Sequence, residues 1–466
     1  MTNYISTRGG VPPQSFTDVL LQGLAPDGGL YIPEEYPKLD LDDMRHMAGV
    51  PYADIAYKVT APFVGDAIPS DVYKRILQEV YQDAFGHSCV APLVQIGPNA
   101  WVMELFHGPT LAFKDYALQL LGRLFDYILE QKGQRVTIVG ATSGDTGSAA
   151  IEACKGCKNI DIFILHPEGR TSEVQRRQMT TIDAPNVHNI ALKGTFDDCQ
   201  NMVKAMFGDK KFSEDINMSA VNSINWARIM AQTVYYVSAS LALGGPSRKV
   251  SFAVPTGNFG NVYAAYVARQ MGLPIKRLII GSNRNDILTR FFETGTMKTD
   301  EVEPSLSPSM DIQISSNFER YLCDLVGRDT SSIAKLMTSF KDKGSFSISS
   351  EHMANARKEF DSHSCNDEQT RGMMNACYQE TGYILDPHTA VGLFAGLQVR
   401  EDPAIPLVAL ACAHPAKFPD AVEKAIGIRP ELPPHLADLY DRKEFVTALP
   451  NDISKVKDFI KSNIEK

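Results

Sequence analysis

The amino-acid sequence predicts an α/β fold with mostly parallel sheets. From Trp101 onwards, short apolar segments alternate with longer amphipathic segments, as strands and helices do in parallel α/β proteins. Two of the apolar segments, Val136–Val139 and Val250–Val254, run into glycine-rich loops that begin helices. Because ligands of open α/β sheets bind at the carboxyl ends of the strands, both loops are candidate ligand sites.

The expected elements follow one another along the chain. Helices over residues 15–23, 41–47, 52–63 and 71–85 are predicted to form an N-terminal helical lobe. Strands are expected at 101–105, 135–140, 160–165, 188–192, 250–255, 276–281 and 405–411. Further helices are expected at 115–131, 145–155, 197–207, 222–243, 260–271 and 416–425. The Ser-, Thr- and Pro-rich stretch from 296 to 316 predicts a surface loop, and residues 317–378 are predicted to be mostly helical.

These elements suggest three domains in a chain of 466 residues, which is long enough for more than one. Residues 1–95 are the N-terminal lobe, and residues 96–245 form one sheet domain. Residues 246–466 form a larger α/β domain with a helical insertion at about 317–380 and C-terminal helices.

Composition argues against several classes of protein. The net charge of −9 argues against a nucleic-acid binder, and no apolar run is long enough to predict a membrane span. The N-terminus has no signal or transit pattern, so we expect a cytoplasmic enzyme, either a monomer or a homodimer. Cys154 and Cys157 form a single CxxC without a second pair, so we expect no metal site and interpret the pair as structural.

The segment His107–Asp115 places a lysine at the start of a long amphipathic helix. Pro109 prevents the helix from extending backwards and Gly133 ends it, so Lys114 should lie at or just before the first turn. The helix dipole and desolvation both disfavour an ammonium group there. A lysine that is readily neutralised can attack a carbonyl carbon and form a Schiff base, although a surface lysine is the commoner alternative.

Each glycine-rich loop can bind an anion. The first contains Ser143, Gly144, Asp145 and Thr146, and its hydroxyls could add donors to the N–H groups of the helix start; an ordinary capped loop is the alternative. The second, Pro255–Asn261, resembles a phosphate cradle made of loop amides and a helix dipole. It has neither the G-x-x-x-x-G-K-[ST] nor the G-x-G-x-x-G spacing, so a nucleotide site has little support.

Four motifs together resemble the threonine synthase family. HGPTLAFKD at 107–115, SGDTG at 143–147, PTGNFGN at 255–261 and AHPAKF at 413–418 occur in the family's order. The phrases YISTRG at 4–9 and GLAPDGGLYIP at 23–33 are similar to its longer bacterial and fungal form. The resemblance covers nearly the whole chain. It implies a pyridoxal-phosphate enzyme of fold type II, with two open, mostly parallel twisted sheet domains and the N-terminal helical lobe.

The resemblance also implies roles for residues. Lys114 matches the Schiff-base lysine. The residues that match the loop holding the phosphate of pyridoxal 5′-phosphate are Gly257, Asn258, Phe259, Gly260 and Asn261. The residues that match the loop facing the cofactor ring and the substrate carboxylate are Ser143, Gly144, Asp145 and Thr146.

Cys412 departs from the family pattern. The family usually has Ser or Thr there, in contact with the pyridine nitrogen of the cofactor. A thiol is a weaker donor and acceptor than a hydroxyl, but it is also neutral, so the same contact is expected. A buried strand cysteine without that role is the alternative.

The implied reaction converts O-phospho-L-homoserine and water into L-threonine and phosphate. Lys114 would be displaced from the cofactor by the substrate amine and would then remove the α-proton, while the cofactor acts as an electron sink. Phosphate leaves from Cγ and water adds at Cβ. Candidate cations for the substrate phosphate are Arg170, Arg176, Arg177 and Lys417, each of which has a solvated surface charge as its alternative. For His107, the two alternatives are a site residue and a structural histidine.

Two other functions are compatible with these parts. One is another fold type II lyase, such as a serine or threonine dehydratase or a cysteine-synthase-like enzyme, which shares the lysine and the glycine loop. HGPTLAFKD and the N-terminal phrases favour threonine synthase over it. The other is a non-catalytic relative that binds a metabolite, and the presence of Lys114 argues against it.

Overall fold

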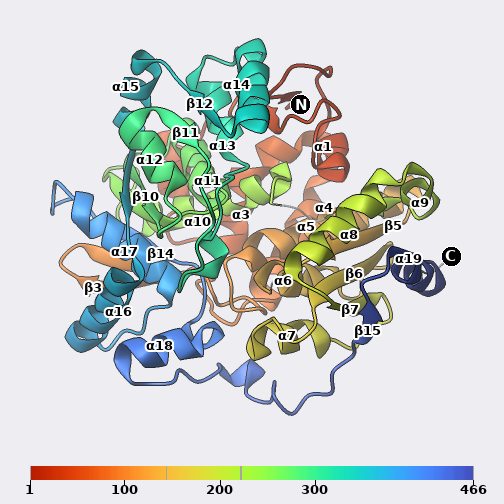
Figure 1. Ribbon diagram of the computed structural model, residues 1–466. Helices are drawn as coiled ribbons and strands as arrows, with labels where there is room; N and C mark the ends of the chain where they lie inside the picture. The colour runs from red at the N-terminus through yellow and green to blue at the C-terminus, as the bar shows by residue number, and fades with distance from the viewer. Residues whose placement is uncertain (1, 143, 221–222, 465–466) are drawn as a thin grey trace. The chain divides into compact units, whose positions relative to one another are not determined.

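The two large sheets of the protein are built mainly from parallel strands, as the alternation of strands and helices predicts (Figure 1). The computed structural model describes residues 2–142, 144–220 and 223–464. These fall into two compact units, each discontinuous in sequence: unit 1 spans 1–107 and 223–430, and unit 2 spans 108–222 and 431–466. The domain boundaries expected near 95 and 245 stay a prediction.

Unit 1 contains a six-stranded sheet in the order β13-β10-β9-β14-β4-β3. Every neighbouring pair is parallel except β3 and β4. Its strands are β3 (Leu93–Gly97), β4 (Ala100–Glu104), β9 (Val250–Pro255), β10 (Ile275–Ser282), β13 (Phe360–Ser364) and β14 (Leu407–Ala411). The phosphate-loop motif therefore follows a central strand, β9, at its carboxyl end.

Helices cover both faces of this sheet because successive strand side chains point in opposite directions. Ala253 of β9 belongs to a buried cluster with Leu393 of α17, whereas the neighbouring Phe252 packs edge-on against Tyr236 of α10 at 4.9 Å between ring centroids. The helices of the second half of unit 1 are α10 (Trp226–Ala242), α11 (Gly260–Gln270), α12 (Ile287–Thr294), α13 (Phe318–Leu325), α14 (Thr330–Lys343), α15 (Ser350–Glu359), α16 (Asp367–Thr381), α17 (Pro387–Val399) and α18 (Pro419–Ile426).

The N-terminal lobe is helical, as predicted, and belongs to unit 1. Its helices are α1 (Phe16–Gln22), α2 (Leu41–Met47), α3 (Tyr52–Val64) and α4 (Ser70–Gln78), the last continued by a π-helical turn over Glu79–Asp83. A short antiparallel pair, β1 (Tyr4–Ser6) and β2 (Tyr31–Pro33), was not predicted. The buried Tyr4 side chain anchors β1 by donating to the carbonyl of Phe63 at 2.7 Å.

Unit 2 contains a five-stranded, wholly parallel sheet in the order β15-β7-β6-β5-β8. The strands are β5 (Val136–Ala141), β6 (Ile160–Pro167), β7 (Val187–Lys193), β8 (Met218–Ser219) and β15 (Thr447–Pro450). The helices are α5 (Lys114–Lys132), α6 (Asp145–Cys154), α7 (Glu173–Thr180), α8 (Phe196–Gly208), α9 (Lys210–Asp215) and α19 (Ile453–Asn463). Helices α8 and α19 pack on one face in a single apolar cluster with strands β5, β6 and β7.

Several expected elements differ from the structure at their ends. The helix expected at 222–243 begins at Trp226, because the side chain of Asn225 caps it; residue 222 lies outside the described part. The helix expected from 416 begins at Pro419, after a 3₁₀ turn over Pro415–Lys417. The loop expected at 296–316 begins with a strand, β11 (Thr296–Lys298), which pairs with β12 (Ser345–Ser347).

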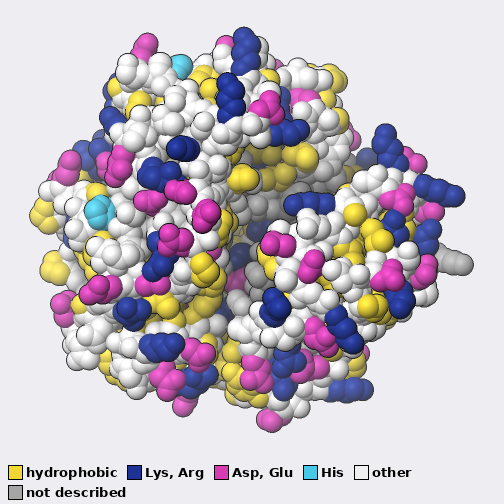
Figure 2. Space-filling model, in the orientation of Figure 1, with side chains coloured by type: hydrophobic (Ala, Val, Ile, Leu, Met, Phe, Trp, Pro, Cys, Tyr) yellow, Lys and Arg dark blue, Asp and Glu magenta, His cyan; other side chains and the backbone are white. Residues whose placement is uncertain are grey.

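The surface shows no single dominant charge on the face seen in Figure 2, where basic and acidic side chains are interspersed. Among the described residues, no helix combines the length and the apolar character needed to cross a membrane.

Candidate active site

Lys114 is the first residue of α5, which confirms its predicted place at the first turn. The loop before it is closed by Asp115, a fully buried residue whose carboxylate accepts from the N–H and the hydroxyl of Thr110. Gly108 makes this possible, because a Cβ there would lie 2.5 Å from the Asp115 side chain. At the other end, Gly133 caps α5 in the left-handed conformation, as predicted.

The amine of Lys114 contacts a carboxylate of the SGDTG loop. Nζ lies 3.3 Å from Oδ2 of Asp145, and only 12% and 7% of the two side chains are exposed. Nζ also lies 5.6 Å from the ring centroid of Phe113. The structure thus brings together two of the predicted site residues, both in unit 2.

Two backbone N–H groups of the SGDTG loop donate to the side chain of the residue that precedes it. Thr142 accepts with Oγ1 from the N–H groups of Gly144 and Gly147, at 3.0 and 2.9 Å. Asp145 begins α6, so its N–H and that of Thr146 lie at the positive end of the helix dipole. The predicted Ser143 lies outside the described residues. Because the N–H groups of Gly144 and Gly147 already donate to Thr142, fewer N–H groups of this loop can bind an anion than the sequence suggested.

Two carbonyl groups of the PTGNFGN loop accept hydrogen bonds from Ser315 and Asn317. The Gly257 carbonyl accepts from Ser315 Oγ at 2.7 Å, and the Asn258 carbonyl accepts from the N–H and the side chain of Asn317, both at 3.1 Å. In the described part of the chain, no backbone or side-chain oxygen accepts from the N–H groups of Gly257, Asn258 or Phe259. With the start of α11 at Gly260, these N–H groups form the cradle for an anion that the motif predicts.

Phe259 adopts a left-handed backbone conformation at φ 61°, which is uncommon for a residue other than glycine. Its ring is fully buried against the rings of Phe318, Tyr321 and Phe360, at 4.9 to 6.0 Å between centroids. Aromatic packing of this kind compensates for backbone strain of about 1–3 kcal/mol, and such strain is typical of ligand-binding turns.

Cys412 lies directly after β14 and is connected to the PTGNFGN loop. The side-chain amide of Asn261 donates to Sγ of Cys412 at 3.8 Å. The same Asn261 accepts with Oδ1 from the hydroxyls of Tyr235 and Tyr236, at 2.5 and 2.7 Å. These two donors fix the orientation of the amide, so that its NH₂ group faces the sulfur.

Arg228 is a buried cation that the sequence analysis missed. It is 4% exposed, and its Nε and Nη1 have no hydrogen-bond acceptor among the described residues. Burial lowers the pKa of its guanidinium to about 10. The next residue, Ile229, lies 3.7 Å from the place of a Cβ on Gly260, so this turn of α10 packs against the start of α11. One signal was available: Arg228 is the single charged residue between Trp226 and Ala242.

Most of the cations considered from sequence are engaged elsewhere. Arg176 and Arg177 both form ion pairs with Glu444. Nε2 of His107 lies 2.7 Å from a carboxylate oxygen of Glu104, and the His107 ring lies tilted beside that of His87 at 4.9 Å between centroids. Lys417 is buried and Arg170 is exposed. Arg176, Arg177 and His107 thus have carboxylate partners within the fold, and their roles in the site stay predictions.

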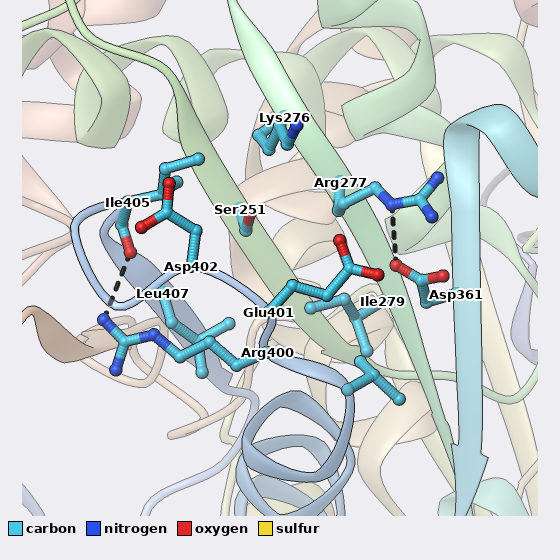
Figure 3. A pocket seen from close by; sticks show the side chains of 11 residues that line it. Ser251, Lys276, Arg277, Ile279, Asp361, Arg400, Glu401, Asp402, Ile405 and Leu407 are labelled. Atoms are coloured by element: carbon cyan, nitrogen blue, oxygen red, sulfur yellow. Dashed lines mark hydrogen bonds and ion pairs between the residues drawn. The ribbon is translucent and has the colours of Figure 1, made fainter.

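Unit 1 contains two cavities that are distinct from the PTGNFGN loop. The smaller cavity, of about 70 Å³, lies where β9 and β10 begin (Figure 3). Among the residues that line it, Arg277 and Asp361 form an ion pair at 2.8 Å, and Arg400 donates a hydrogen bond to the carbonyl of Ile405. Because ligands bind at the carboxyl ends of such strands, it is not the expected site. A cavity of about 810 Å³ is lined by residues of α13, α14 and the N-terminal segment and reaches Ser315, which holds Gly257.

Metal ligands do not gather in the described part of the chain, where no three His, Cys, Asp or Glu side chains are placed to hold an ion. Cys154 and Cys157 are buried free thiols, and burial raises the pKa of Cys157 to about 12. Cys157 contacts the carbonyl of Gly122 in α5 at 3.9 Å, which supports a structural interpretation.

Comparison with known proteins decides the family. The model described as pyridoxal-phosphate dependent enzyme matches residues 90–407, and those for the threonine synthase N terminus and C-terminal part match 3–81 and 389–460. A threonine synthase of Pseudomonas aeruginosa is 56% identical over 98% of this chain and 97% of its own. The chain belongs to the threonine synthase family. This confirms the fold type II architecture and pyridoxal phosphate as the cofactor.

Solved members of the threonine synthase family share the whole fold. The structure from Brucella melitensis, whose title names bound PLP, is 50% identical, covers 100% of both chains and gives a TM-score of 0.99. The yeast structure is 40% identical, covers 99% of this chain and 98% of its own, and gives a TM-score of 0.95.

Proposed function

We propose that this chain converts O-phospho-L-homoserine and water into L-threonine and phosphate, with pyridoxal 5′-phosphate as cofactor. The observation that carries the proposal is the end-to-end similarity to threonine synthases together with the intact lysine motif, whose lysine begins α5. A fold type II dehydratase would share the lysine and the phosphate loop. The family-specific N-terminal and C-terminal matches favour threonine synthase over it.

The residues present fit the cofactor. The N–H groups of Gly257, Asn258 and Phe259, with those of Gly260 and Asn261 at the start of α11, would hold its phosphate, because these donors have no acceptor in the described part of the chain. Cys412, held by Asn261, would contact the pyridine nitrogen as a neutral group. When bound, the cofactor supplies an electron sink for the charge left on Cα of an amino acid.

Lys114 would bond the cofactor through Nζ and, once displaced by the substrate amine, would take the proton from Cα. A primary amine performs this step only when it is neutral and close to the carbon, so its placement controls the rate. The rigid turn formed by Gly108, Thr110 and Asp115 supplies that placement.

The anionic groups of the substrate need separate donors. For the carboxylate, we propose the N–H groups of Asp145 and Thr146 at the start of α6, together with Ser143 and the Thr146 hydroxyl of the same loop. Gly144 would contribute through its close backbone approach, because its N–H donates to Thr142. For the phosphate, we propose Arg228, since a buried guanidinium whose Nε and Nη1 have no acceptor among the described residues gains most from a phosphate ligand. The alternative for Arg228 is the phosphate of the cofactor.

We further propose that the protein acts on this small molecule alone, in the cytoplasm, as a monomer or a homodimer. The net charge of −9 and the interspersed surface charges support the absence of a nucleic-acid partner (Figure 2).

The experiment is an assay of the purified protein with added cofactor. We expect threonine and phosphate in equal amounts from O-phospho-L-homoserine, and no ammonia from serine or threonine. Lys114→Ala should abolish both products while the circular dichroism spectrum stays unchanged. Ammonia release from serine without threonine formation would identify a dehydratase, and binding of the amino acid without any turnover would identify a non-catalytic relative.

A further inference from the structure

A chain of hydrogen bonds runs from Lys114 through unit 2 to the start of α7. Lys114 Nζ donates to Oδ2 of Asp145 at 3.3 Å, and Gln175 Nε2 donates to Oδ1 of the same carboxylate at 2.8 Å. Ser172 Oγ donates to Gln175 Oε1 at 2.9 Å. The Asp145 carboxylate thus divides its two oxygens between the lysine and the glutamine.

The direction of each bond follows from the groups involved. An ionised carboxylate only accepts, so Gln175 must present its NH₂ group to Asp145. Its carbonyl oxygen then faces the hydroxyl of Ser172, which is a donor. Ser172 is in turn fixed as the N-cap of α7, where it accepts from the N–H of Gln175 at 3.4 Å. The glutamine amide therefore has one orientation in this network.

The SGDTG loop has a glycine, Gly144, at the point where the Gln175 amide packs against it. A Cβ on Gly144 would lie 2.4 Å from Oε1 and 2.5 Å from Cδ of Gln175, so the amide packs directly on the glycine. Any other residue at 144 would displace the amide or the loop. Close approach of a side-chain amide to a glycine is thus part of how the Asp145 carboxylate is held.

Helix α7 also supports the loop that precedes Lys114. Gln178, three residues after Gln175 and on the same face of the helix, donates to the Thr110 carbonyl at 3.0 Å. One face of α7 therefore holds both the turn that places Lys114 and the carboxylate that contacts its amine.

From this geometry we infer that Gln175 is a positioning residue for Lys114 and acts through the Asp145 carboxylate. The carboxylate serves the lysine amine and not the substrate, because an acidic side chain repels a substrate that carries a carboxylate and a phosphate. The effect on catalysis rests on the proposed function, whereas the effect on the amine itself does not.

The test follows the reactivity of Lys114 in the cofactor-free protein. The rate at which an amine-specific reagent labels the peptide containing Lys114 is measured by mass spectrometry. We expect Asp145→Asn to raise this rate about tenfold, because the amine loses its ion-pair partner. We expect Gln175→Leu to raise it about threefold, and the double variant to match Asp145→Asn, because coupled residues are not additive.

The control is Gln134→Leu, which changes an exposed glutamine of the same unit and should leave the rate unchanged. If Gln175→Leu does not fold, Ser172→Ala keeps the glutamine and removes the group that orients it, and the rate should rise in the same direction. An equal effect of Gln175→Leu with and without Asp145→Asn would overturn the inference, as would an unchanged rate in Asp145→Asn.

A second readout uses the enzyme with its cofactor. Gln175→Leu should lower kcat about tenfold and leave KM for O-phospho-L-homoserine within about twofold, since the inferred effect of the glutamine passes through Asp145 to the lysine. A raised KM with kcat unchanged would contradict the inference. If the wild type forms no threonine, the proposed function fails, but the labelling rates still decide the role of Gln175.

Discussion

Asp115 accepts two hydrogen bonds from one residue, Thr110: one from its N–H at 2.8 Å and one from its hydroxyl at 2.7 Å. Asp115 is fully buried and directly follows Lys114. The two bonds link the ends of the loop over residues 110–115, so the backbone of Lys114 is part of a hydrogen-bonded turn. The structure therefore connects the stability of this turn with the position of the reactive amine.

Asp115→Asn should destabilise the fold by about 1–3 kcal/mol, because a neutral amide accepts more weakly than a carboxylate and offers one oxygen instead of two, so the Thr110 hydroxyl can no longer donate to residue 115 and must accept from its NH₂ group. Urea unfolding measures the loss. Asp42→Asn, an exposed carboxyl in α2, is the control and should change the free energy of unfolding by less than about 0.5 kcal/mol. Equal effects of the two substitutions would show that the turn is not held by Asp115.

The place of Lys114 could be predicted from sequence because two strong signals bound its helix. Pro109 and Gly133 act through backbone chemistry that does not depend on tertiary contacts. The PTGNFGN loop was predictable for the same reason, since a buried strand, a glycine loop and a helix start follow directly along the chain. In both cases the local sequence contains the physical cause.

Gly257→Ala should weaken cofactor binding about tenfold, because its Cβ would lie 3.0 Å from the Ser309 carbonyl and the loop would have to shift. Titration of the protein with pyridoxal phosphate measures the affinity. Gly372→Ala is the matched control: nothing lies within 4 Å of a Cβ there, on the exposed side of α16. It should leave affinity unchanged and stabilise the fold by about 0.5–1 kcal/mol. Unchanged affinity in Gly257→Ala would argue against the cradle.

Arg228→Leu should stabilise the protein and impair it as an enzyme. In the part of the chain that the structure describes, Nε and Nη1 of this buried guanidinium have no acceptor. Its removal therefore removes a desolvation cost, and the free energy of unfolding should rise by about 1–4 kcal/mol. KM for the phosphorylated substrate should rise tenfold or more, a loss of about 1.4 kcal/mol of binding. If stability falls and KM is unchanged, Arg228 serves the fold and not an anion.

Glu104→Gln tests the pair that Glu104 forms with His107. Burial raises the pKa of the Glu104 carboxyl, but hydrogen bonds from His107 and Tyr383 outweigh burial and hold it below its usual 4.5. A carboxyl with a lowered pKa stabilises the fold above its unfolded pKa and loses this effect as the pH falls through the folded pKa. The wild type should therefore exceed the variant by about 1–2 kcal/mol at neutral pH.

The difference between wild type and Glu104→Gln should close as the pH is lowered below about 4.5, as measured by urea unfolding at several pH values. Glu130→Gln, an exposed carboxyl of α5, should show a difference below about 0.5 kcal/mol throughout. A constant gap for Glu104→Gln at all pH values would mean that the carboxylate charge contributes nothing.

Residues that act through tertiary contacts could not be placed from sequence. Gln175 lies in α7, a polar helix whose only buried apolar residues are Val174 and Met179, so no apolar periodicity predicted even the helix. Its contact with Asp145 joins residues 30 positions apart. Arg228 gave only a weak signal, since one arginine in an apolar helix is equally consistent with a buried ion pair. Only the three-dimensional structure shows that its Nε and Nη1 find no acceptor within residues 2–142, 144–220 and 223–464.

Borohydride reduction of the protein in the presence of pyridoxal phosphate, followed by mapping of the labelled peptide, tests directly whether Lys114 forms the Schiff base. We expect a single pyridoxyl group on Nζ of Lys114 and none in Lys114→Ala. A label on another lysine, or no label in a folded wild-type protein, would contradict it.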